Sequence, residues 1–230
     1  MSQNWDQLLF AHWPVKAEIL EAHIPQEFTL DTYDGYAWIA VVPFLMNKVK
    51  FRYLPEIPMT NRFLELNVRT YIKYKEKSGV YFFSLDASNL LAVEAARNWF
   101  GLPYLQAKMN DSKMPEDSHS IHYASTRVDR RAPSANLDVR YRPTGEIIKS
   151  SAGSLEEFLT ERYCLFCLRG RSIMRGDIHH KKWDLQPAEA EFRENTMLEP
   201  LGIDVDNLGP PLLYYSHAIE TLEWPPTVQN

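Results

Sequence analysis

The chain has 230 residues and 45% hydrophobic residues, enough for one large domain with a substantial core. Its formal net charge is −5 and its basic residues are scattered, which argues against nucleic-acid binding, because phosphate neutralisation needs a concentrated positive surface. Glycine is scarce (9), proline is frequent (15) and the apolar runs are short, so the sequence predicts a mainly β fold with a few helices.

The sequence shows neither a membrane span nor a leader. It has no run of about 18 apolar residues, and residues 1–13 lack the basic and apolar regions of a secretory signal. We therefore expect a cytoplasmic protein with no membrane partner. Because no repeat or Gly/Ser-rich linker divides the chain, we expect a single domain over residues 1–230.

The first predicted elements are a helix and a hairpin. Residues 15–25 predict a short amphipathic helix that ends at a proline. Residues 28–46 predict a short strand, a turn at Asp34-Gly35 and a long strand, because Asp-Gly is a strong hairpin signal. Residues 47–60 contain two prolines and are expected to form a loop over a pocket.

Residues 63–72 (FLELNVRTYI) carry the most informative pattern. Aliphatic residues at 64, 66 and 68 alternate with Glu65, Asn67 and Arg69, so a strand here places an acid, an amide and a base on one face. Residues 80–87 are apolar on both faces, which is typical of a strand covered on both sides. The two patterns together predict a closed or nearly closed sheet around a polar cavity. An open sheet with a wet outer face explains them equally well.

A helix is expected over residues 90–100. Ser88 or Asn89 can cap its start, and Gly101 ends it. Arg97 lies near its C-terminal end, where the helix dipole favours a cation, so this arginine has a structural role open to it as well as a binding role.

The second half of the chain is predicted to be mostly strands. A polar loop is expected at 110–120. Ser154 and Glu157 have the spacing of a capping box, which predicts a helix that gives way near residue 163 to a strand. A short helix is expected near 195–201. Further strands are expected at 122–128, 137–143, 172–180, 185–193 and 212–224.

Cys164 and Cys167 are the only cysteines. A zinc site needs four ligands and no second cysteine pair exists, although His179 and His180 are available in principle to complete one. A redox role is disfavoured because the pair does not open a helix in a βαβ unit. We interpret both as buried thiols, and we expect no metal and no cofactor.

Other titratable residues lie near the capped helix and the last strand. Glu161 and Arg162 can line a site or form an ion pair that fastens the helix to the sheet. His180 and His217 stand near aromatic residues, which suits proton transfer or stacking, and each can equally be structural. No catalytic triad, metalloprotease motif, phosphate loop or dinucleotide fingerprint accompanies them.

Several segments together resemble one family. In order and approximate spacing, the chain is similar to the YqjF-like family (DUF2071), and the resemblance covers essentially the whole chain. It rests on residues 63–72, 80–87, 95–104, 154–163, 180–189 and 212–224. That family is related in fold to acetoacetate decarboxylase. The resemblance therefore implies an α+β, mainly antiparallel β fold: an acetoacetate decarboxylase-like, cone-shaped β-barrel with a few short flanking helices.

The resemblance also bears on catalysis. In the decarboxylases a helix arginine is followed by a proline and then by paired lysines, of which the second forms a Schiff base with a β-keto acid. Arg97 and Pro103 keep that spacing here, but the lysine positions are Tyr104 and Leu105. A Schiff base requires a primary amine, so acetoacetate decarboxylase activity is not expected. Lys108 is the nearest amine and is expected on the surface.

Comparison with the decarboxylase pocket singles out one acid. Glu65 aligns with an acidic residue of that pocket, while its N-terminal arginine falls on Asp6. Tyr104 can offer a phenol at the pocket mouth or can simply pack. We expect an enclosed polar and aromatic pocket for an organic acid or aromatic compound, with these ligand-binding candidates: Glu65, Asn67, Arg69, Arg97, Tyr104, Glu161 and His217.

Two other functions remain open. One is an enzyme that uses general acid/base catalysis on a keto acid, with Glu65 as the base and Arg97 or Arg69 holding a carboxylate. The other is a structural protein whose aromatic surface binds a partner. Homo-oligomers are an expectation from the resemblance, because related barrels assemble.

Overall fold

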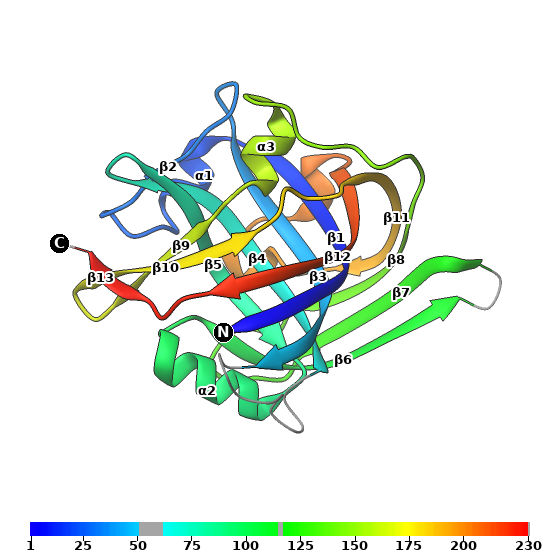
Figure 1. Cartoon of the computed structure of the whole chain (residues 1–230), viewed down its shortest axis with the longest axis horizontal. Coiled ribbons are helices and arrows are strands. Elements are labelled where there is room, and N and C mark those ends of the chain that lie inside the picture. Colours follow the sequence, from blue (N-terminus) through cyan, green and yellow to red (C-terminus); the bar gives the residue numbers. More distant parts are fainter. Residues whose placement is uncertain (51–61, 115–116, 230) are drawn as a thin grey trace.

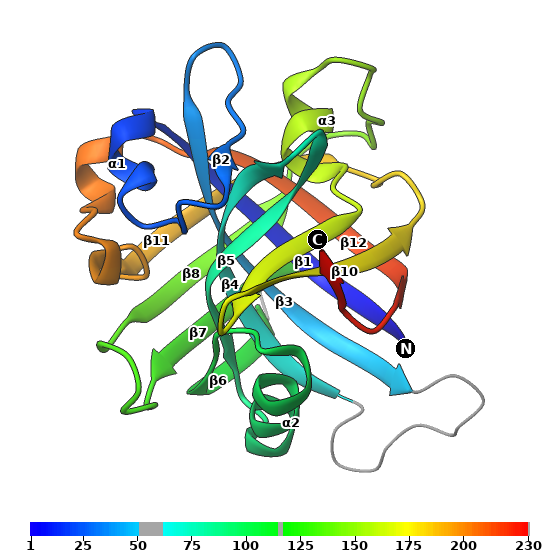
Figure 2. The ribbon, with the colours of Figure 1, turned by 90° about the vertical axis from the view of Figure 1, so that its left-hand side faces the viewer.

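The computed structural model describes residues 1–50, 62–114 and 117–229. These residues form thirteen strands in one hydrogen-bonded sheet, with short helices at its margins (Figures 1 and 2). The strands are β1 (Ser2–Val15), β2 (Thr29–Leu30), β3 (Ala37–Lys50), β4 (Arg62–Tyr74), β5 (Lys77–Ala87), β6 (Tyr104–Met114), β7 (Asp117–Arg127), β8 (Asn136–Pro143), β9 (Cys164–Arg169), β10 (Ser172–His180), β11 (Gln186–Asn195), β12 (Leu212–Glu223) and β13 (Thr227–Gln229). The helices are α1 (Ala17–Glu21), α2 (Leu90–Phe100), α3 (Leu155–Thr160), and the 3₁₀ turns η1 (Glu199–Leu201) and η2 (Val205–Leu208).

The sheet is mainly antiparallel and forks at two strands. β5 pairs in parallel with β9 at Val80 and with β6 from Leu85 onward. β12 pairs with β11 near Tyr215 and with β10 near its C-terminal end. The sheet therefore closes twice, and both closures use the same shared wall of β12, β1, β3, β4 and β5.

We call the two closures the packed ring and the hollow ring. The packed ring joins the shared wall to β6, β7, β8 and β11, and the hollow ring joins it to β9 and β10. Figure 2 shows β6, β7 and β8 on one side of β4 and β10 on the other. The closed, ring-like sheet predicted from the sequence is thus confirmed, and one wall serves two interiors.

The alternation of apolar and polar residues along β4 explains how one wall can face two interiors. Leu64, Leu66 and Val68 belong to the largest buried apolar cluster, together with Tyr123 and Val139 from the packed ring. Successive residues on a strand point to opposite faces, so residues 65, 67 and 69 turn toward the hollow ring. The sequence pattern of β4 is therefore that of a strand buried on both faces, with one face apolar and one polar.

The predicted helices after β5 and before β9 are confirmed. In α2 the Asn89 Oδ1 accepts a hydrogen bond from the backbone N–H of Ala92 at 3.1 Å, and Gly101 ends the helix in the left-handed region with φ 69°. In α3 the Ser154 Oγ accepts from the backbone N–H of Glu157 at 3.2 Å. None of the helices in the described ranges is long and apolar enough to span a bilayer.

Three predicted elements were wrong or incomplete. Residues 2–15 form β1, a long strand that pairs with both β12 and β3, so the predicted helix shrinks to α1. Residues 110–114 and 117–120 belong to the β6–β7 pair rather than to a loop, because polar strands with one exposed face look like loops in the sequence. The turn predicted at Asp34-Gly35 is confirmed by the antiparallel bridge between Tyr33 and Tyr36, but β2 itself pairs with β4 rather than with β3. The loop predicted over a pocket falls mainly on residues 51–61, which lie outside the described residues.

Candidate functional site

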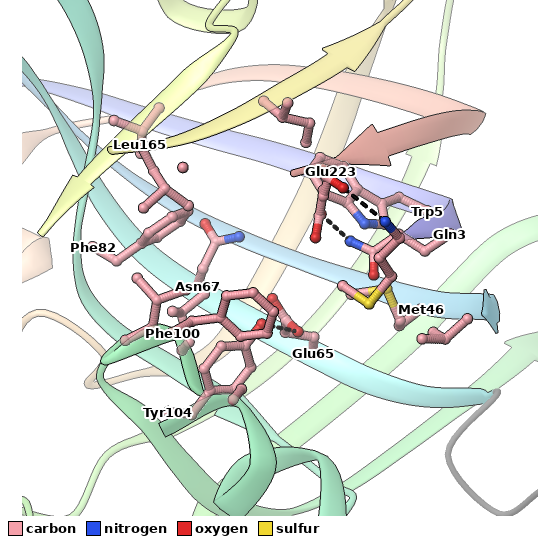
Figure 3. A pocket seen from close by; sticks show the side chains of 18 of the residues that line it. Gln3, Trp5, Met46, Glu65, Asn67, Phe82, Phe100, Tyr104, Leu165 and Glu223 are labelled. Carbon is pink, nitrogen blue, oxygen red and sulfur yellow. Dashed lines mark hydrogen bonds between the residues drawn. The ribbon is translucent and has the colours of Figure 1, made fainter. Parts of the chain in front are cut away.

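A cavity of about 370 Å³ lies inside the hollow ring (Figure 3). Its walls come from β1, β3, β4, β5, β9, β10 and β12, and α2 borders one end. The volume falls in the range of small-molecule sites, which are about 300–1,000 Å³. Most lining side chains are apolar or aromatic, among them Phe82, Phe100 and Leu165, which Figure 3 shows around the cavity. Such a wall favours ligands with apolar surface.

The polar stripe of β4 faces this cavity. Glu65, Asn67 and Arg69 all line it, and they are 3%, 5% and 8% exposed. Because a strand rises about 3.3 Å per residue, the Cα atoms of Glu65 and Arg69 are roughly 13 Å apart. The cavity thus has an acid toward one end, an amide in the middle and a base toward the other end.

Arg69 is a buried cation without a compensating anion. Among the described residues it forms no ion pair, and its Nε has no hydrogen-bond partner. The guanidinium carbon lies 5.4 Å from the centre of the Phe10 ring and 5.9 Å from that of Tyr71, so aromatic faces provide its surroundings. In the same part of the structure the Oδ1 of Asn67 is also buried without a partner. Both side chains keep hydrogen-bonding capacity for a bound molecule.

Glu65 has unusual acidity. Burial raises the pKa of Glu65 to about 8, and the nearby Glu223 and Asp86 carboxylates act in the same direction. The hydroxyl of Tyr104 donates to Glu65 Oε2 at 3.1 Å, which opposes the rise only in part (Figure 3). Burial also raises the pKa of Tyr104 well above its ordinary value. At neutral pH this pair is mostly uncharged and can exchange a proton with a ligand.

Glu223 at the end of β12 is a second cavity carboxyl that our sequence reasoning missed. Burial raises the pKa of Glu223 to about 7, and the side chain of Gln3 donates a hydrogen bond to it (Figure 3). A signal was present in the sequence, because the buried Ile219 and Thr221 share a strand face with residue 223. At neutral pH Glu65 is mostly protonated and Glu223 is about half protonated, so the two acids leave much of the Arg69 charge unbalanced.

Arg162 also lines the cavity, but its charge is matched. Its Nη1 contacts Asp31 Oδ2 at 2.7 Å, and its Nε donates to the Phe158 carbonyl at 2.7 Å. Burial would raise the pKa of Asp31, yet the hydrogen bonds from Arg162 and Lys73 hold it below its ordinary value. Arg162 is therefore part of a structural ion pair, in contrast to Arg69.

Comparison with known proteins assigns the chain to a family. The family model DUF2071, described as an uncharacterized conserved protein, matches residues 2–220. The chain belongs to the DUF2071 family. It is 44% identical over 225 residues to the uncharacterized protein YqjF of Bacillus subtilis (strain 168), a match that covers 98% of this chain and 90% of the relative.

Solved structures show that this DUF2071 chain has the acetoacetate decarboxylase-like fold. An acetoacetate decarboxylase-like enzyme from Sphingomonas wittichii RW1 matches with a TM-score of 0.66 at 13% identity, over 100% of this chain and 92% of the other. The enduracididine biosynthesis enzyme MppR, complexed with pyruvate, matches with a TM-score of 0.64 at 9% identity, over 99% and 89%. At such identities the likeness shows the fold alone.

The positions that the resemblance matched to the decarboxylase lysines hold no amine in this DUF2071 chain. Tyr104 lines the cavity and Leu105 is buried. Lys108 is exposed on β6, as expected. None of the described residues that line the cavity is a lysine. These residues offer no amine for a Schiff base inside the cavity.

The other three sequence candidates lie outside the cavity lining. Arg97 donates from Nη1 to the Tyr104 carbonyl at 2.7 Å and so ties α2 to the start of β6. Glu161 accepts from the backbone N–H of Trp183 at 3.1 Å, which connects the end of α3 to the segment after β10. His217 is exposed on β12, 3.4 Å from the hydroxyl of Tyr215. Glu65, Asn67, Arg69 and Tyr104 therefore line one cavity, whereas Arg97, Glu161 and His217 do not line it.

The two cysteines are buried free thiols. Cys164 lines the cavity, and burial raises the pKa of both Cys164 and Cys167 above the ordinary value. Within the described ranges no cluster of three or more His, Cys, Asp or Glu side chains is arranged to hold a metal ion. Cys164 therefore contributes a polarizable thiol to the cavity wall rather than a reactive thiolate.

Proposed function

We propose that this protein binds a small organic acid, or an aromatic compound with an acidic group, inside the hollow ring without forming a Schiff base. The observation that carries the proposal is Arg69, which is 8% exposed, lines the cavity and has no ion-pair partner within the described part of the chain. An uncompensated buried charge costs several kcal/mol. A ligand carboxylate at Arg69 offsets that cost, and guanidinium groups bind carboxylates through two parallel hydrogen bonds.

The neighbouring groups suit the rest of such a ligand. Asn67 offers both a donor and an acceptor beside the carboxylate, and Glu65 with Tyr104 offers a largely neutral pair for a carbonyl or hydroxyl group. The aromatic side chains of Phe82 and Trp5 supply flat apolar surface. A structure of the same fold, that of MppR, contains pyruvate, which is a small organic acid.

General acid/base catalysis is the second candidate. The pKa of Glu65 is about 8 and that of Glu223 about 7, so both carboxyls can gain or lose a proton near neutral pH. In this candidate Arg69 holds the carboxylate of a keto acid and Glu65 removes a proton beside the carbonyl. Arg97 is less suited to the holding role, because its guanidinium is bonded to the Tyr104 backbone outside the cavity. Glu65→Gln would then keep binding and lose turnover.

The test of the binding proposal begins with protein purified from its host. We expect mass spectrometry to detect a co-purified carboxylic acid with the wild type and to find at least tenfold less of it with Arg69→Gln, because hydrogen bonds to charged groups contribute about 1.5–3 kcal/mol. Arg142→Gln is the matched control, since Arg142 is exposed and ion-paired with Glu189 on the outer face. Equal loading of all three proteins, or a ligand without an acidic group, would contradict the proposal.

A further inference from the structure

We propose that the acid is amphipathic: its carboxylate binds at Arg69, and its apolar chain runs along β4 and leaves the cavity beside Leu91 and Trp99 of α2. This inference rests on the proposed carboxylate site and adds the class of acid that the cavity selects. Three features of the hollow ring support it: a closed end at Arg69, walls that are mostly apolar opposite the polar stripe of β4, and an apolar rim.

The end of the cavity near Arg69 is closed by α3. Leu159 and Tyr71 are fully buried there, and the Tyr71 hydroxyl donates to the Leu159 carbonyl at 2.8 Å. That hydroxyl accepts from Nε2 of the buried His12 at 2.7 Å, so its hydrogen bonds are used within the protein. A ligand group at this end therefore meets Arg69 as its main unsatisfied polar partner.

The opposite end of the cavity is bordered by α2 and the segment after β12. Figure 1 shows α2 and α3 at opposite ends of the sheet. Leu91, Trp99 and Trp224 are 59%, 62% and 49% exposed, and all three line the cavity. Exposed large apolar side chains gathered around an opening indicate a surface that contacts apolar groups. A short ligand held at Arg69 does not reach these three side chains.

The inner face of α2 leaves room for a chain to pass. Ala92, Ala95 and Ala96 line the cavity, and their spacing places them on one side of the helix. Between α2 and Arg69 the walls are formed by apolar side chains that include Phe82 and Leu165 (Figure 3). Small side chains under the helix and large ones along the walls form a channel suited to a methylene chain.

The dimensions separate this inference from binding of a short acid. Arg69 and Glu65 are roughly 13 Å apart along β4, and α2 lies beyond Glu65, where Phe100 flanks Tyr104 (Figure 3). An acid of three or four carbons held at Arg69 ends well before α2. An acid of eight to ten carbons is needed to fill the channel.

The test is calorimetry of the full chain with butanoate, hexanoate, octanoate and decanoate. We expect the dissociation constant to fall about fourfold for each added methylene, which corresponds to about 0.8 kcal/mol of burial. 1-Decanol should bind at least tenfold more weakly than decanoate. Leu91→Ser should weaken decanoate binding several-fold, whereas Leu90→Ser, at an equally exposed neighbour that does not line the cavity, should leave it unchanged.

The outcomes distinguish this inference from the proposed function. If butanoate and decanoate bind equally and both depend on Arg69, the carboxylate site stands and the amphipathic ligand is ruled out. If no acid of the series binds, the amphipathic ligand is ruled out, and the carboxylate site is then judged by the co-purified acid and its loss in Arg69→Gln. Equal binding of decanoate to wild type and to Arg69→Gln, or equal effects of Leu90→Ser and Leu91→Ser, would also overturn the inference.

Discussion

The packed ring and the hollow ring each contain a buried arginine, Arg127 of β7 and Arg69 of β4, and the two differ in whether their charge is paired. In the packed ring, the Nε and Nη2 of Arg127 donate to the two carboxylate oxygens of Asp86, each at 2.8 Å. Nη2 also donates to the hydroxyl of Ser84 at 3.0 Å, and Nη1 donates to the Pro133 carbonyl at 3.1 Å. In the hollow ring, Arg69 forms no ion pair among the described residues and its Nε has no partner, although its side chain is within hydrogen-bonding reach of Tyr71. Breaking a paired buried charge costs free energy, because the partner is left unpaired, whereas Arg69 has no buried anion to leave behind among the described residues.

The same contrast applies to the strand between them. Leu66 lies opposite Asp86 in the β4–β5 pair, so both belong to the packed side. Asn67, one residue on, faces the cavity with a free Oδ1 in the described structure. One face of β4 thus belongs to a dense apolar core and the other to a polar cavity, and the core face supplies most of the stabilising contacts of this strand.

The largest effect is expected from Arg127→Met. It leaves Asp86 buried without its partner, so the free energy of unfolding should fall by about 3–5 kcal/mol, measured by urea denaturation. Arg142→Met is the control, because Arg142 forms its ion pairs with Glu189 and Asp117 at the surface, and a loss of less than about 1 kcal/mol is expected there. Equal losses of unfolding free energy in the two variants would contradict the expected difference between a buried and an exposed ion pair.

The next effect is expected from Glu65→Gln, and it depends on pH. The pKa of Glu65 is about 8 in the folded protein and about 4.5 when unfolded, so between these values only the folded chain keeps the proton. Wild-type stability should therefore fall as pH rises from 4.5 to 8, by at most about 1.4 kcal/mol per pH unit from this group.

Urea denaturation between pH 5 and pH 8 measures this dependence. Glu65→Gln should flatten it, leaving the contribution of Glu223, which has the same sign because its pKa is also raised. Glu220→Gln, at an exposed position of β12, is the matched control and should keep the wild-type slope. An unchanged slope in Glu65→Gln would show that Glu65 is ionised at neutral pH.

The smallest change in stability is expected from Arg69→Met. Removing this charge breaks no ion pair in the described structure, and methionine preserves packing against Phe10. The free energy of unfolding should stay within about 1 kcal/mol of wild type or increase, while carboxylate binding is lost. A loss above about 2 kcal/mol in thermal or urea unfolding would indicate that Arg69 is structural, like Arg127.

Local sequence signals predicted much of this fold. The alternation at residues 63–72 predicted both faces of β4, and Asn89 with Gly101 predicted the bounds of α2. The same alternation and the resemblance singled out Glu65, Asn67, Arg69 and Tyr104, which the structure gathers in one cavity. These predictions worked because periodicity and capping depend on residues close together in the sequence.

Features that depend on distant contacts were not predictable in this way. β1 was missed because it is buried on both faces and shows no alternation, and Glu223 gains its raised pKa only from burial within the folded ring. That Arg69 forms no ion pair within the described ranges is a consequence of the whole fold, as is the hydrogen bond that holds Arg97 to the Tyr104 carbonyl. The spacing of residues in the sequence does not reveal which buried charged side chains form ion pairs in the folded protein.

The pairing of β1 with β12 has a consequence for how the protein forms. Ser2 lies opposite Leu222, and both the packed ring and the hollow ring contain this pair. Neither interior can close during synthesis until the ribosome has released residues near 222. Contacts this distant in sequence slow folding, since a long loop must be ordered before they form. The apolar core of the packed ring and the cavity of the hollow ring therefore form together, late, when β12 pairs with β1. A nascent chain that ends before β12 can form neither ring.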